Sequence, residues 1–160
     1  MTIAADLRES ALSKAATVVI ATSVLVLIGL LVAGMFSGEI LGNMAFGMLT
    51  TSVGVLIATV ISLKAPHSTH RFVRALWIAW AVTVLLVGLL LGPERGGATV
   101  IMYSMAIVSF PVGLVAIPLA GVASSGLPAW MAIILLWTVA AGLGYAQWFL
   151  VLAKLRPSAN

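Results

Sequence analysis

The side chains that could take part in chemistry are few, and most of them lie outside the long apolar runs. The four carboxylates occupy short polar segments, at Asp6, Glu9, Glu39 and Glu94. General acid–base catalysis needs such groups close to one another or to a histidine. The sequence contains no paired-carboxylate, Ser-His-Asp or HExxH pattern. We therefore expect no catalytic residue, no enzyme activity and no bound cofactor.

Two histidines stand three residues apart in the most basic segment, residues 64–74. On one helical turn, His67 and His70 would share a side and could bind a metal together. This segment supplies no carboxylate, and the chain has no cysteine, so further ligands are missing. We predict that both histidines are solvated at a membrane interface and that there is no metal site.

The most informative polar side chain is Gln147, which lies inside a charge-free run. At about 100° per residue it shares a helix face with Ala140 and Gly144. These two have the small-xxx-small spacing that lets another helix approach, and the amide could hydrogen-bond across that contact. We predict a helix-packing and interaction face at these three residues. The alternative is that Tyr145 and Gln147 line a substrate path.

A second short motif lies at Gly88 and Gly92, which have a GxxxG spacing near the end of another apolar run. Glycines at this spacing allow close helix contacts in membranes. The spacing is also common by chance in apolar sequence. We predict a packing contact at these two glycines.

The segment 99–120 is free of charge but irregular. Pro111 and Pro118 each lack a backbone donor and free the carbonyl four residues earlier. Ser109 is placed to supply a replacement hydrogen bond, which makes prolines tolerable in a membrane helix. We predict a kinked packing helix. The alternative is an interrupted helix that exposes carbonyl groups to an ion, as in some transporters.

These residues must be positioned by membrane helices, because 62% of the 160 residues are hydrophobic and only 8% are charged. Charge-free runs of about 20 residues can cross a hydrocarbon core of about 30 Å. We predict an all-α integral membrane protein with one polytopic domain, residues 1–160, and no soluble domain. The expected bundle has five hydrophobic helices, at residues 15–36, 44–63, 75–92, 99–120 and 130–153. The first is too long for a cleaved signal peptide, so we expect an uncleaved anchor.

The eight lysines and arginines can be divided between the two membrane faces in two ways. With five crossings, five of these cations lie on the N-terminal side and three on the other. If residues 99–120 dip into the membrane and return, four crossings leave only Arg95 on the far side. Cytoplasmic segments carry the excess of positive residues, so charge favours four crossings and a cytoplasmic N-terminus. The length of segment 99–120 favours five crossings, which is our prediction, with the re-entrant arrangement as the alternative.

Four tryptophans lie close to the ends of the predicted helices. They are Trp77, Trp80, Trp130 and Trp148. Indole rings favour the interface between membrane and water. We predict that these rings form interfacial belts.

No Asp, Glu, Lys, Arg or His lies within the five predicted helices, which argues against coupled ion transport. The net charge of +4 is concentrated at helix ends, so we expect contact with the lipid bilayer and not with nucleic acid. We expect a non-enzymatic component of a bacterial cytoplasmic (inner) membrane, an accessory or interaction subunit or an immunity- or exclusion-type factor. Its partner would be another membrane protein or further copies of itself. The alternative is a small oligomeric transporter or channel with a path near the fourth helix.

Overall fold

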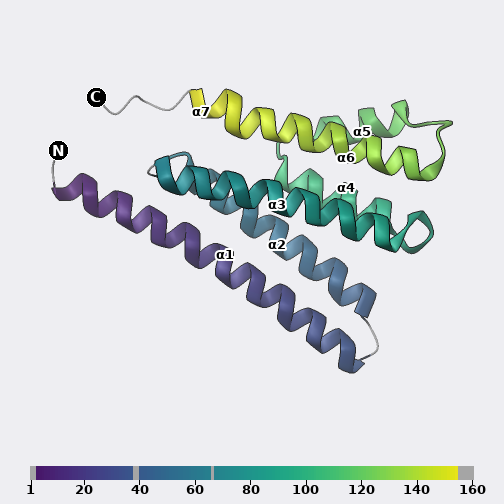
Figure 1. Ribbon diagram of the computed structural model, residues 1–160, viewed down its shortest axis with the longest axis horizontal. Coiled ribbons are helices and arrows are strands. Elements are labelled where there is room, and N and C mark those ends of the chain that lie inside the picture. Colours follow the sequence, from purple (N-terminus) through teal and green to yellow (C-terminus); the bar gives the residue numbers. More distant parts are fainter. Residues whose placement is uncertain (1–2, 38–39, 66, 155–160) are drawn as a thin grey trace.

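All regular secondary structure in the described part of the chain is helical (Figure 1). The computed structural model describes residues 3–37, 40–65 and 67–154. These ranges hold seven α-helical segments, α1 to α7, and no strand, so the all-α prediction is confirmed. Four helices are long and apolar enough to cross a membrane, which makes the chain an integral membrane protein. The four candidate spans are Ser10–Leu30, Leu41–Ser62, His67–Leu91 and Ala129–Lys154.

Helices α1 (Ile3–Ser37) and α2 (Ile40–Ser62) form a long hairpin at one edge of the molecule (Figure 1). α1 begins well before the predicted residue 15. The polar lead is helical because no glycine or proline interrupts the sequence before Gly29. Glu39 lies outside the described residues, as do the side chains of Asp6 and Glu9.

Helix α3 (His67–Leu91) is followed by a 3₁₀ turn, η1 (Pro93–Arg95), and by α4 (Gly97–Val108). Gly92 adopts a φ of 71°, which residues with side chains rarely do, and this ends α3. The N–H of Gly97 then donates to the carbonyl of Gly92 at 2.9 Å. As a result α4 starts directly beside the last turns of α3.

The prediction of one helix over residues 99–120 is wrong, because the chain turns back at Pro111. α4 ends at Val108, and α5 (Gly113–Ala123) begins after a turn whose Phe110–Pro111 peptide bond is cis. With 12 and 11 residues, neither short helix is long enough to cross a hydrocarbon core. Proline has no N–H to continue the α4 ladder, which is the local reason for the interruption.

Helix α6 (Ala129–Tyr145) continues through a π-helical segment, η2 (Ala146–Val151), into α7 (Leu152–Lys154). It starts at the end of the bundle where α3 ends, since the ring of Trp130 lies 3.5 Å from the position of a Cβ on Gly92. Figure 1 shows that α4 runs inward from this end and α5 runs back to it. The α4–α5 pair therefore enters and leaves the bundle at the same end.

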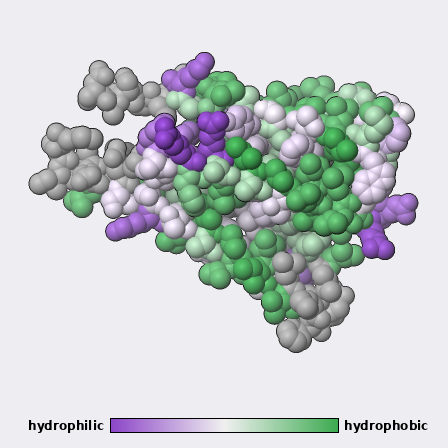
Figure 2. Space-filling model, viewed as in Figure 1, coloured by the Kyte–Doolittle hydropathy of each residue, from purple (hydrophilic) through white to green (hydrophobic). Residues whose placement is uncertain are grey.

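The core lies where α2, α3, α4 and α6 meet. Its largest fully buried apolar side chains are Trp77, Ile101, Met105 and Ile133. On the face seen in Figure 2, hydrophobic residues cover the middle of the molecule and hydrophilic residues gather toward its ends. Lipid chains are as apolar as these side chains, so an outward-facing apolar surface is stable in a membrane.

Candidate functional site

The most unusual feature of the fold is the turn between α4 and α5, residues Ser109–Val112, here called the α4–α5 turn. The 12 residues of α4 rise by about 18 Å, so the turn lies deep in the bundle, against α3 and α6. Irregular backbone at such a depth is tolerated only where protein or a water-filled cavity satisfies its polar groups. The partners of these groups therefore decide what the site can do.

Several backbone groups of the turn are paired locally. The N–H of Phe110 donates to the carbonyl of Ile107 at 3.1 Å, and that of Gly113 donates to Ser109 at 2.8 Å. The carbonyl of Ile107, which the sequence predicts to be freed by Pro111, is therefore occupied. Three groups in the turn or directly before it have their partners on other helices: the carbonyls of Val108 and Phe110 and the N–H of Val112.

Gln147 binds both sides of the turn with one amide group. Its Nε2 donates to the carbonyl of Phe110 at 2.8 Å, and its Oε1 accepts from the N–H of Val112 at 3.1 Å. The two bonds bracket Pro111 and take the place of backbone pairs that a continuous helix would have. Both ends of the amide are thus engaged with backbone, and the orientation of the side chain is set by these partners.

Two indole N–H groups bind the last carbonyl of α4. Trp148 Nε1 donates to the carbonyl oxygen of Val108 at 3.0 Å, and Trp77 Nε1 lies 3.4 Å from the same atom. A carbonyl at a helix C-terminus lacks an intrahelical donor, and burying it unpaired costs free energy. The indoles supply the missing donors. No local pattern marks them for this role, because the acceptor is 31 residues from Trp77 and 40 from Trp148.

The prediction of interfacial belts is wrong for three of the four tryptophans. Trp77, Trp80 and Trp148 are buried in the bundle. Trp80 Nε1 donates to the hydroxyl of Ser52 at 3.1 Å, so each buried indole has an acceptor inside the protein. Trp130 is 49% exposed, at the end of the bundle.

The face of Ala140, Gly144 and Gln147 lies against the α4–α5 turn of the same chain. A Cβ on Gly144 would overlap the side chain of Ser109, so the two backbones touch only because this residue is glycine. The hydroxyl of Ser109 donates to the carbonyl of Ala140 at 2.9 Å, across helices and not within α4. This face is occupied within the chain, and association with another chain needs a different surface.

The predicted packing residues Gly88 and Gly92 lie at the α3–α4 connection, and the predicted kink residue Pro118 lies in α5. A Cβ on Gly88 would overlap Ile101, and one on Gly97 would overlap the carbonyl of Gly88. Gly92 lies in the same contact and accepts the N–H of Gly97. Pro118 lies inside α5 and is exposed, away from the α4–α5 turn.

Tyr145 belongs to an aromatic cluster that joins the first turns of α3 to η2. Its ring lies 5.3 Å from that of Phe149 and 6.1 Å from that of Trp77, between centroids. The Arg74 guanidinium lies 5.1 Å from the Tyr145 centroid, close enough for a cation–π contact. Tyr145 therefore packs against aromatic neighbours and a cation.

The two histidines have different surroundings. His67 is exposed, as predicted. His70 is buried, with its Nδ1 3.3 Å from the hydroxyl of Ser62 and its ring 5.4 Å from that of Phe149, so the prediction that it is solvated is wrong. His67 is the first residue of α3, whereas His70, one turn further along, meets Ser62 of α2 and Phe149 of η2. In the described ranges no group of three or more metal-ligating side chains comes together.

The hydrogen bonds described above show that the α4–α5 turn is a break in the helical backbone whose polar groups are paired by side chains of other helices. Its backbone carbonyls are bonded to Trp77, Trp148 and Gln147, and the last two belong to the π-helical segment, a type of distortion that is frequent at functional sites. Neutral amides and indoles can hold the backbone in place through their N–H groups, but they neither gain nor lose a proton at ordinary pH. No protein-family model, curated protein or solved structure matches this chain.

Proposed function

We propose that this chain is a non-enzymatic membrane component that works by associating with a helix of another membrane protein, as an accessory subunit or as an immunity- or exclusion-type factor. The observation that carries the proposal is the exposure of α1. This helix contains an apolar span of 21 residues, yet only 6% of its most apolar window is buried. A helix with so few buried residues has most of its surface free to contact lipid or another helix.

The surface best suited to a partner helix lies on the outer side of the α1–α2 hairpin. A groove of about 360 Å³ runs there between the two helices, here called the α1–α2 groove. Its lining is apolar, with small residues that allow close approach. The lining residues are Val18, Val19, Thr22, Ser23, Val26, Thr50, Val53, Gly54 and Ile57.

The α1–α2 groove is held in shape by tight contacts beneath it. A Cβ on Gly54 would overlap the hydroxyl of Ser23, so α2 touches α1 closely at this point. The hydroxyl of Thr51 lies 3.2 Å from the carbonyl of Ser23 and also bonds within α2. A preformed groove lowers the ordering cost of binding a helix.

The charges support four crossings with a cytoplasmic N-terminus, in a bacterial cytoplasmic (inner) membrane. Five cations of the described residues lie toward the end of the bundle where α1 begins. They are Lys14, Lys64, Arg71, Arg74 and Lys154. Arg95 lies at the opposite end. In this arrangement the α4–α5 pair is re-entrant: α4 packs against α2, α3 and α6, whereas α5 packs against α4 and α6 and leaves its other side exposed.

Single cysteine substitutions test this topology. The chain has no cysteine of its own, so only the introduced residue can react with a maleimide. Four crossings require cysteines at Arg95 and at Ser125 to react with a membrane-impermeant maleimide from the same side of the membrane, opposite to one at Lys64. Five crossings would place Arg95 and Ser125 on opposite sides. Labelling of these two positions from different sides would therefore reject the re-entrant arrangement.

A second candidate is an oligomeric transporter or channel with a path at the α4–α5 turn. Backbone broken deep in a membrane bundle is typical of transporter binding sites, which favours this candidate. In those sites carbonyl groups face the ion, whereas here the carbonyls of Val108 and Phe110 accept hydrogen bonds from side chains. Ion flux through liposomes containing the purified protein, lost on Gln147→Met, would support the channel over the association proposal.

Site-specific photo-crosslinking in native membranes tests the association proposal directly. A photoreactive residue placed at Val26 or at Val53, on the two walls of the α1–α2 groove, should form a discrete adduct with a protein. Twice the monomer mass would identify a second copy, and another mass a different partner. Leu119 is the matched control, because it is apolar, 64% exposed and on the far helix α5. Equal adducts at Leu119, or none at the groove positions, would contradict the proposal.

A further inference from the structure

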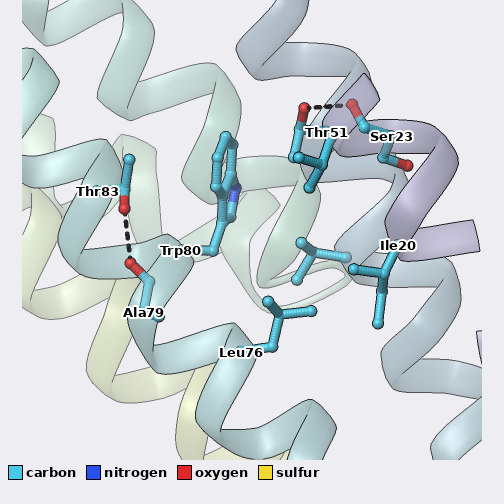
Figure 3. Close-up of a pocket in the computed structure, with 9 residues that line it drawn as sticks. Ile20, Ser23, Thr51, Leu76, Ala79, Trp80 and Thr83 are labelled. Carbon is cyan, nitrogen blue, oxygen red and sulfur yellow. Dashed lines mark hydrogen bonds between the residues drawn. The ribbon is translucent and has the colours of Figure 1, made fainter. Parts of the chain in front are cut away.

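The side of α1 opposite the α1–α2 groove faces α3 across a second hollow, here called the α1–α3 crevice. Its deep part is a partly enclosed cavity of about 140 Å³ between α1, α2 and α3 (Figure 3). Its outer part, of about 320 Å³, lies between the first turns of α3 and the corresponding turns of α1. The lining positions follow one another at spacings of three and four residues along both helices, so the two parts lie on the same helix faces.

The deep part of the crevice is apolar. Figure 3 shows the side chains of Ile20, Leu76 and Trp80 around the hollow. Thr83, at its rim, donates its hydroxyl to the carbonyl of Ala79 at 2.9 Å. The hydroxyl of Ser23 is likewise bonded within α1, to Val19 at 2.8 Å. With their hydroxyls engaged in this way, the walls suit a hydrocarbon chain.

The outer part of the crevice is more polar than the deep part, although Ala16 and Phe72 also line it. Hydroxyl side chains of both helices line it, and one of them, Thr69, donates to Ser13 at 3.1 Å across the gap. The remaining hydroxyls of the lining belong to Thr17 and Ser68. The crevice therefore becomes less polar along its length from the outer to the deep part, as a lipid molecule does from head group to acyl chain.

Two cations flank the polar part, one on each wall. Lys14 lies three residues before Thr17 on α1, and Arg71 lies three residues after Ser68 on α3, so each pair shares a helix surface. Both cationic side chains are exposed. Among the described side chains the only carboxylate is Glu94, which follows α3 at the other end of the bundle. The acids of α1, Asp6 and Glu9, lie further toward its N-terminus.

The length of the crevice matches one leaflet of a bilayer. From Lys14 to Val24, ten residues of α1 rise by about 15 Å, which is half of a hydrocarbon core of about 30 Å. A lipid phosphate at the level of Lys14 and Arg71 would place its acyl chain along Ile20, Leu76 and Trp80. We propose that the α1–α3 crevice binds an anionic phospholipid of the leaflet at the basic end, and this inference does not depend on the association proposed above.

Native mass spectrometry of the detergent-purified protein tests the lipid site. The protein is titrated with phosphatidylglycerol and with phosphatidylcholine of the same acyl chains. We expect one phosphatidylglycerol to bind in preference to phosphatidylcholine. Lys14→Gln and Arg71→Gln should each weaken phosphatidylglycerol binding about fivefold, since a cation near a lipid surface contributes about that factor. Neither substitution should change phosphatidylcholine binding.

Arg74→Gln is the matched control, because Arg74 lies at the same end of the bundle but over the Tyr145 ring and away from the crevice. It should leave phosphatidylglycerol affinity unchanged. Ala79→Phe, which fills the deep part, should weaken binding of both lipids. Equal affinity for the two lipids, an equal loss with Arg74→Gln, or no loss with Lys14→Gln and Arg71→Gln would each overturn the proposal. A photoreactive residue at Leu76 that captures a protein and not a lipid would assign the crevice to a helix instead.

Discussion

Replacing Gln147 by methionine tests whether its amide holds the α4–α5 turn. Methionine keeps the length and flexibility of the side chain but removes the donor to Phe110, at 2.8 Å, and the acceptor from Val112, at 3.1 Å. The substitution also leaves the carbonyl of Phe110 and the N–H of Val112 without their partner. Both effects destabilise the folded state and leave the helix propensity of η2 nearly unchanged.

The expected loss of stability is set by these two terms. Interhelical hydrogen bonds in membrane proteins average about 0.6 kcal/mol each, so two bonds contribute about 1 kcal/mol. A backbone group left unpaired in a buried site adds about 1–3 kcal/mol, and less where water can reach it. Gln147 is half-buried, which places the turn at the lower end of this range. With two backbone groups left unpaired, we therefore expect Gln147→Met to lower the free energy of unfolding by about 2–3 kcal/mol.

Equilibrium unfolding in mixed micelles measures this loss, and hydrogen exchange locates it. Thr138→Val is the control on the same helix, because the Thr138 hydroxyl is exposed and bonds only to Ile134 of its own helix. The control should change stability by less than about 0.5 kcal/mol. Exchange at the amide of Val112 should accelerate in Gln147→Met and not in Thr138→Val. A loss equal to that of the control, with Val112 exchange unchanged, would refute the role assigned to Gln147.

Three further substitution pairs test the same packing. Ser109→Ala should lower the free energy of unfolding by about 1 kcal/mol, because it removes the hydrogen bond to Ala140. Ser104→Ala should be neutral or stabilising, since the equally buried Ser104 hydroxyl has no partner among the described residues. Unfolding in mixed micelles compares the two variants. Gly144→Leu should prevent formation of a monodisperse protein. Gly142→Leu should be tolerated, because a Cβ at that position meets nothing within 4 Å. Size-exclusion profiles that do not differ between the two variants would count against the close approach at Gly144. His70→Ala should lower the free energy of unfolding by about 2 kcal/mol through a cavity beside Phe149, and exposed His67→Ala should have no effect, so equal thermal stability of the two variants would be the contrary result.

Local properties of the sequence were sufficient for the general class of the fold. Charge-free runs of sufficient length indicate membrane helices, and four of the five predicted runs coincide with helices that are long enough to cross. For residues 99–120, segment length predicts one crossing helix, whereas the structure has two shorter helices. The distribution of cations, with Arg95 alone on one side, already favoured the arrangement in which α4 and α5 return to the same end.

What the polar residues do was decided by tertiary structure. The prolines mark where a backbone ladder fails, and this is a local effect that the sequence shows. The groups that repair the failure come from residues 31 to 40 positions away, so neither periodicity nor motif spacing could identify Trp77, Trp148 or the two partners of Gln147. Burial of the Trp77 and Trp148 indoles follows from the same cause, since a freed carbonyl inside a bundle requires a donor. Hydropathy along the chain identifies the membrane segments, and only the packing of the helices specifies which of these segments are long enough to cross and which side chain meets which broken hydrogen bond.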